Sequence, residues 1–98
     1  MSGALQTVKA ELEPALERLV VLVEQEGDER QGAFFLRVLG LVRACRELED
    51  LAAPMMELST SAFLGFRYSL SVHILLDQVL AIAQKAAITL SADSENTQ

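Results

Sequence analysis

One long apolar stretch, from Ala62 to Leu90, constrains the fold of this chain more than any other feature. Its only formal charges are Arg67, Asp77 and Lys85. Wound as a helix, it has a broad apolar face and, between two polar rows, a narrower one. The narrow face consists of Leu70, Ile74, Ala81 and Ile88. Two apolar faces imply two neighbours, so we expect a central helix that packs on its own chain and on a second copy.

The length of this stretch favours the same interpretation. At 1.5 Å per residue the helix would be about 43 Å long, more than the diameter of a compact domain of this size. We therefore expect it to overhang its own chain. A strand is the alternative, because Phe66–Ile74 alternates apolar and polar residues. No other segment alternates, so such a strand would lack a partner within the chain, and the helix is favoured.

The first part of the chain predicts a helical hairpin. Apolar residues recur at steps of three and four from Leu5 to Val23, which is typical of a helix with one buried stripe. Pro14 either kinks this helix or begins a new one, and the unbroken apolar phase favours a kink. Gly27 is placed to end the helix and Asp28 to cap a second one from Glu29.

The end of the second helix is harder to place. Pro54 favours a stop at Ala53, whereas Met55 and Leu58 continue the apolar phase. We expect the break between Ala53 and Ser61. The predicted fold is all-α: an elongated helical hairpin plus a long third helix, completed as a bundle by a homodimer. Residues 1–90 would form one domain, and the polar residues 91–98 a disordered tail.

Composition limits the partners. The chain has 98 residues, 51% of them hydrophobic, and a mean hydropathy of +0.29. A domain this small buries only a modest fraction of its surface, so some apolar surface should meet another chain. The net charge of −6 disfavours nucleic acid and anionic lipid. We expect no membrane span, since polar groups interrupt every window of the apolar stretch, and a cytoplasmic protein with one unpaired cysteine, Cys45.

The one arrangement with possible chemistry is Ser69, His73 and Asp77, spaced by four residues. A hydroxyl, an imidazole and a carboxylate in this order are used in nucleophilic catalysis, but successive turns of one helix supply no oxyanion hole. One histidine and one cysteine, without a ligand pair, predict no metal site. No glycine-rich phosphate loop is present, so no cofactor is expected.

The predicted function is a non-enzymatic helical module for protein–protein interaction, such as an adaptor, a regulator or a small structural subunit. We expect a homo-oligomer, most simply a dimer, with room for an unidentified protein partner. The predicted interface residues are Met55, Met56, Leu70, His73, Ile74, Asp77 and Ala81. The alternative is a small-molecule-binding or catalytic bundle with a polar pocket around His73 and Asp77.

Overall fold

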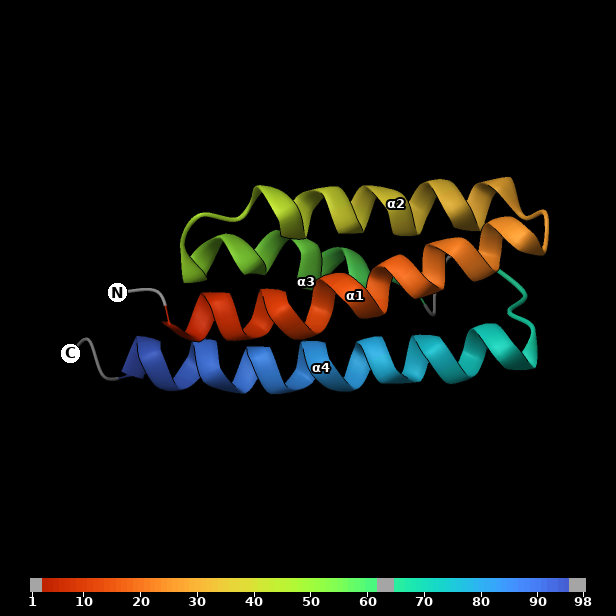
Figure 1. Ribbon diagram of the computed structural model, residues 1–98. Coiled ribbons are helices and arrows are strands. Elements are labelled where there is room, and N and C mark those ends of the chain that lie inside the picture. The colour runs from red at the N-terminus through yellow and green to blue at the C-terminus, as the bar shows by residue number, and fades with distance from the viewer. Residues whose placement is uncertain (1–2, 62–64, 96–98) are drawn as a thin grey trace.

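The chain folds into a slender helical bundle. The computed structural model describes residues 3–61 and 65–95, and within them four α-helices run alternately up and down (Figure 1). The helices are α1 (Gly3–Gln25), α2 (Glu29–Ala44), α3 (Ala52–Ser59) and α4 (Leu70–Glu95), and the short 3₁₀ helix η1 (Leu48–Leu51) precedes α3. The extents are 46 × 21 × 18 Å. The expected all-α fold is confirmed.

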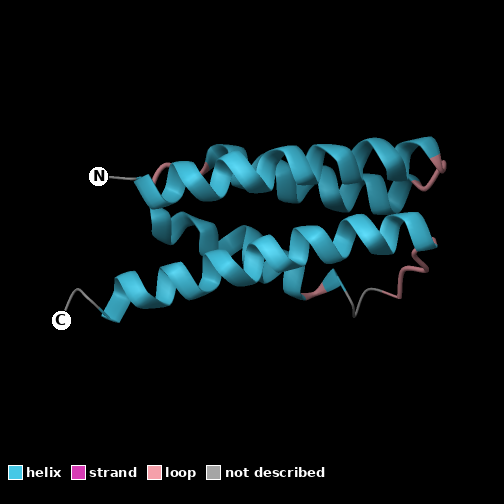
Figure 2. Cartoon of the chain, turned by 60° about the horizontal axis from the view of Figure 1, so that its bottom comes forward, coloured by secondary structure: helices cyan, strands magenta, loops and turns pink. Residues whose placement is uncertain are grey.

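The four helices form a closed ring of neighbours. Helix α1 packs against α2 and α4, and α3 packs against α2 and α4. Seen from another side, α4 crosses in front of the short α3, while α1 and α2 lie together as a pair (Figure 2). The prediction of three helices was incomplete, because the short α3 occupies the fourth corner. Helix α1 is almost as long as α4, so the expected overhang of α4 is short: only its C-terminal end extends past the other described helices (Figure 1).

Helix α1 and its link to α2 follow the predicted signals. Pro14 lies inside α1, which is a single helix, as its unbroken apolar phase indicates. Gly27 has a φ of +79°, which glycine adopts easily. The amides of Gly27 and Asp28 donate to the carbonyls of Glu24 and Val23, at 3.0 and 3.2 Å, as in a Schellman motif. The Asp28 carboxylate caps α2 by accepting from the Gln31 amide at 2.9 Å.

The predicted end of the second helix is wrong. Helix α2 ends at Ala44, well before the expected break between Ala53 and Ser61, and Cys45 is extended. One Asp50 oxygen accepts from the amides of Arg46 and Glu47, each at 3.0 Å, and so begins η1. The acidic run therefore lies at the start of a helical segment, where negative charge is favourable. Pro54 falls in the first turn of α3. Amide hydrogens in the first turn have no partner within the helix, so proline costs no hydrogen bond there.

The long helix is shifted along the chain from its predicted position. It begins at Leu70 rather than Ala62, and residues 65–69 are neither helix nor strand; residues 62–64 lie outside the described part. The Ser69 hydroxyl caps α4 by accepting from the Val72 amide at 3.2 Å. The helix continues to Glu95, past Leu90, because no glycine or proline follows to end it. The alternation of Phe66–Ile74 forms no strand.

One buried core joins the four helices and η1. All the largest fully buried side chains are apolar, and they come from every helical segment: Phe35, Leu5, Leu12, Leu16, Leu19, Leu51, Leu58, Val23, Val38, Val42, Val72 and Val79. The buried Gln31 amide group donates to the Arg67 carbonyl at 3.0 Å, and the Tyr68 hydroxyl donates to the Ser61 carbonyl at 2.8 Å. These two bonds hold the segment before α4 and so fix where α4 begins.

Candidate functional site

Helix α4 has one buried and one exposed apolar face, as predicted for the long helix. Its inner face contributes Val72, Leu76, Val79, Ala83 and Ala86 to the core. The opposite face carries four apolar residues, which we call the outer stripe: Leu70, Ile74, Ala81 and Ile88. Leu70 is 78% exposed, Ile74 53% and Ile88 71%. The described part of the chain therefore leaves this stripe in contact with solvent.

Polar residues border the outer stripe on both sides. Lys85 lies on the side of α1, where its ammonium is 3.6 Å from the Glu11 carboxylate. Gln84 lies on the side of α3, where it lines a groove with Met55. Asp77, one helical turn before Ala81, lies on the same side as Gln84. Asp77, Gln84 and Lys85 are all exposed, so the stripe is a narrow apolar line between hydrophilic edges.

The two methionines of the predicted interface lie on α3. Met55 is half-buried and lines a groove of about 260 Å³ between α3 and α4, together with Leu58, Ser59, Leu80, Ala83, Gln84 and Ala87. Met56 is 70% exposed. The groove lies beside the outer stripe, since Gln84 borders both. The structure thus places the predicted interface residues on two neighbouring helices, five on α4 and two on α3.

Ser69, His73 and Asp77 do not form a reactive group. All three are exposed. The Ser69 hydroxyl donates to a Glu26 carboxylate oxygen at 2.8 Å and accepts from the Val72 amide, so it serves as a helix cap. The His73 and Tyr68 rings pack in a T-shaped arrangement, with ring centres 5.6 Å apart. Ser69 and His73 therefore use these contacts instead of the hydrogen bond that a catalytic serine and histidine share.

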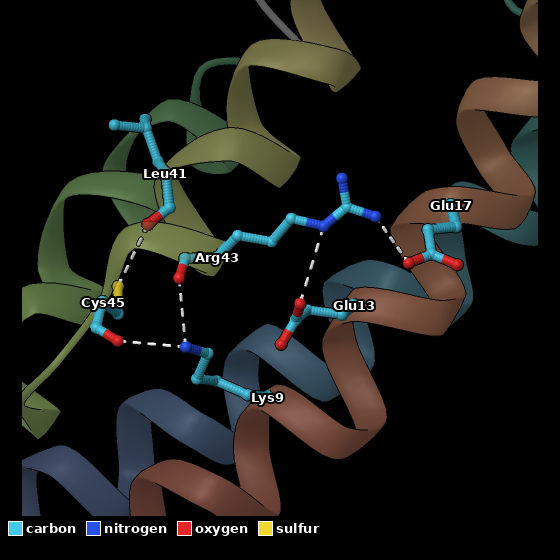
Figure 3. Close-up of polar contacts among 6 residues, drawn as sticks. All are labelled: Lys9, Glu13, Glu17, Leu41, Arg43 and Cys45. Atoms are coloured by element: carbon cyan, nitrogen blue, oxygen red, sulfur yellow. Dashed lines mark hydrogen bonds and ion pairs between the residues drawn. The ribbon is translucent and has the colours of Figure 1, made fainter.

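A polar cluster joins α1 to the end of α2 (Figure 3). Lys9 donates from Nζ to the carbonyls of Arg43 and Cys45, at 3.2 and 3.0 Å. The Arg43 guanidinium lies 2.7 Å from the Glu17 carboxylate and 3.7 Å from that of Glu13. A cation at the carbonyl end of a helix is favourable. These contacts therefore hold the C-terminal end of α2 in place. The cluster is therefore a cap rather than a binding site.

Burial makes the Cys45 thiol harder to ionise. Burial, followed by the nearby Asp50 carboxylate, raises the pKa of its thiol, while Lys9 acts in the opposite direction. The Sγ atom donates to the Leu41 carbonyl at 3.2 Å. A buried thiol with a raised pKa is a poor nucleophile at neutral pH. Within the described ranges, no group of three His, Cys, Asp or Glu side chains is placed to hold a metal ion.

Sequence reasoning missed the roles of Lys9 and Gln31. An antiparallel hairpin places the first turns of one helix beside the last turns of the other, so a lysine near the start of α1 can reach the end of α2. That signal was present in the sequence. Gln31 gave no such signal, since its partner is the carbonyl of Arg67, which is remote in sequence.

By length and composition alone, Leu70–Ser91 of α4 would suffice to cross a membrane. Core helices of soluble proteins, which are mostly buried, pass the same test, whereas only 22% of the tested window of α4 is buried in the described bundle. The two formal charges of this segment, Asp77 and Lys85, lie on its exposed side, where lipid would surround them at a high cost in free energy.

Two more exposed apolar side chains lie apart from α4. Val21 on α1 is 52% exposed and Leu36 on α2 is 51% exposed. Single exposed apolar residues are normal on a protein surface, whereas a line of them on one helix marks a surface for contact. The outer stripe of α4 is therefore the candidate site. Comparison of the chain with protein-family models, with curated proteins and with solved structures gives no match.

Proposed function

We propose that this protein is a non-enzymatic helical interaction module that associates with itself through α4. One observation carries the proposal: three large apolar side chains, Leu70, Ile74 and Ile88, lie on one line of one helix and are each more than half exposed. Burying a large apolar side chain fully contributes about 1.5–3 kcal/mol. A partner that covers the stripe therefore gains affinity from several side chains at once.

The groove between α3 and α4 extends this surface. Met55 lines it and Met56 is exposed on the same short helix. Methionine side chains adapt to partners of different shape. A second protein of the cytoplasm could bind beside the self-associated α4, which fits the role of an adaptor, a regulator or a small structural subunit.

The charge of the chain fits a protein partner better than the alternatives. A net charge of −6 repels nucleic acid and anionic membrane surfaces. The polar edges around the apolar stripe resemble the rim of a protein interface, which stays solvated while the centre is buried.

Light scattering on fractionated protein tests the proposal. The chain has a mass of 10.7 kDa, and we expect the measured mass to rise toward twice that value between about 1 and 500 µM. Ile74→Glu introduces a charge on the stripe and should weaken association about ten-fold or more. Leu36→Glu is the matched control, because Leu36 on α2 is as exposed as Ile74 and should leave the association unchanged. A monomer of 10.7 kDa at every concentration would refute self-association.

A further inference from the structure

The central part of the outer stripe and the charges beside it are placed symmetrically about Ala81. Ile74 and Ile88 lie seven residues before and after it. Asp77 and Lys85, the only formal charges between Leu70 and Ser91, lie four residues before and after it. An aspartate on one side of the centre is therefore matched by a lysine on the other.

We propose that two copies pair through α4 in an antiparallel arrangement, with the two-fold axis at Ala81. In such a pair, a residue that lies a given number of positions before the centre meets the partner's residue that lies as many positions after it. Ile74 then faces the partner's Ile88, and Asp77 comes within reach of the partner's Lys85. Each contact occurs twice. This inference rests on the proposed function, because it specifies how the self-association occurs.

The charges select this arrangement over a parallel one. In a parallel pair in register, Asp77 would face Asp77 and Lys85 would face Lys85, and like charges at close range are unfavourable. The antiparallel pair replaces both repulsions with attractions. Centring the pair on Ala81 also overlaps almost the whole helix, because residue 70 then aligns with residue 92.

The required groups are available on the surface. Asp77 is exposed, and within the described residues it has no hydrogen bond or ion pair. Lys85 is 74% exposed, and its 3.6 Å contact with Glu11 is an open surface pair of the kind that contributes little. The lysine can therefore turn toward a partner. In Figure 1, α4 forms one edge of the bundle, and no other described helix lies beyond it.

The small side chain of Ala81 lets the two helices approach closely, so the distance between the two Ala81 Cα atoms can be tested. Closely packed helices lie about 8–10 Å apart, and Cα atoms lie about 2.3 Å from each axis. The two Ala81 Cα atoms would therefore be about 3.4–5.4 Å apart, which overlaps the range of disulfide geometry. The two Ile74 Cα atoms would instead be about 21 Å apart along the pair, from fourteen residues at 1.5 Å each.

Disulfide trapping under mild oxidation by glutathione tests the arrangement. Ala81→Cys should form a covalent dimer with itself. Ile74→Cys alone should not, but a mixture of Ile74→Cys and Ile88→Cys should form mixed dimers. Cys45 is present in every variant, and the wild-type chain controls for it because this thiol is buried.

Charge reversal provides an independent readout. Asp77→Lys and Lys85→Asp should each raise the dissociation constant about ten-fold, because each turns two attractions into two repulsions. The double variant, with both changes, should return to within about three-fold of the wild type, and circular dichroism checks that each variant folds.

The outcomes separate this inference from the proposed function. Ready self-linking of Ile74→Cys, or charge reversals without effect on a dimer that still forms, would overturn the antiparallel pairing and leave self-association standing. A wild-type chain that is monomeric at every concentration would overturn both. Binding of the monomer to neutral lipid vesicles through α4 would also overturn both, by assigning the stripe to a membrane surface.

Discussion

At the scale of single residues, Lys9 illustrates how one side chain fixes the position of a helix. Its ammonium caps the carbonyls of Arg43 and Cys45 at the end of α2. We expect Lys9→Met to lower the free energy of unfolding by about 1 kcal/mol, because two carbonyls lose a charged donor. Urea unfolding followed by circular dichroism measures this. Arg37→Met, which breaks an exposed pair with Glu57, is the control and should change stability by less than about 0.5 kcal/mol. Equal losses in the two variants would contradict the capping role.

Cys45 gives a prediction about pH. Burial raises the pKa of its thiol, so the folded chain favours the protonated form. Stability from this source is complete below the ordinary thiol pKa and falls as the pH rises through the raised value of the folded state. We expect the thiol to react with a disulfide reagent at pH 8 much more slowly in native protein than in urea. The rate of thiol release measures it, and equal rates in both conditions would contradict the account.

At the scale of elements, two glycines with open surroundings should respond oppositely to alanine. Gly27 ends α1 with a φ of +79°, and Gly40 lies inside α2; a Cβ added at either position meets nothing within 4 Å. Gly27→Ala should cost about 1 kcal/mol, because only its backbone conformation is unsuitable for alanine. Gly40→Ala should gain about 0.5–1 kcal/mol, because alanine favours the helix. Chemical unfolding of both variants measures the pair, and a change of the same sign in both would contradict this explanation of the cap.

The sequence predicted a helix boundary correctly where a single residue near that boundary determines it. Gly27 and Asp28 placed the first turn correctly, because each acts through its own backbone or a neighbour three residues away. The end of α2 could not be placed in this way. The apolar phase continues past Cys45, and the break depends on Lys9, which is remote in sequence, and on Asp50, whose carboxylate turns back to two preceding amides.

The start of α4 was missed for a similar reason. Its apolar composition extends back to Ala62, but residues 65–69 are held outside the helix by bonds from Gln31 and Tyr68. These contacts exist only once the hairpin has formed. The faces of α4 were nevertheless predicted correctly, because helical periodicity alone determines which residues lie opposite the core.

At the scale of the whole molecule, the ring of four helices explains why one apolar stripe remains uncovered. Helices α1 and α3 flank α4 on its inner side, and α2 lies diagonally across the ring. The outer stripe points away from all three. The sequence predicted this exposed line and its residues. The placement of Asp77 and Lys85 about Ala81 can be interpreted only when the helix is known to be continuous from Leu70 to Glu95.

Residue-resolved NMR over a dilution series is the most direct test of the claim that a second copy docks on α4. Between about 500 µM and 10 µM, we expect concentration-dependent shifts of the amides of Leu70, Ile74, Ala81 and Ile88, because these residues leave or enter the interface. Leu36, equally exposed on the diagonal helix, should show none. Shifts centred on Leu36, or spectra unchanged across the series, would contradict the account.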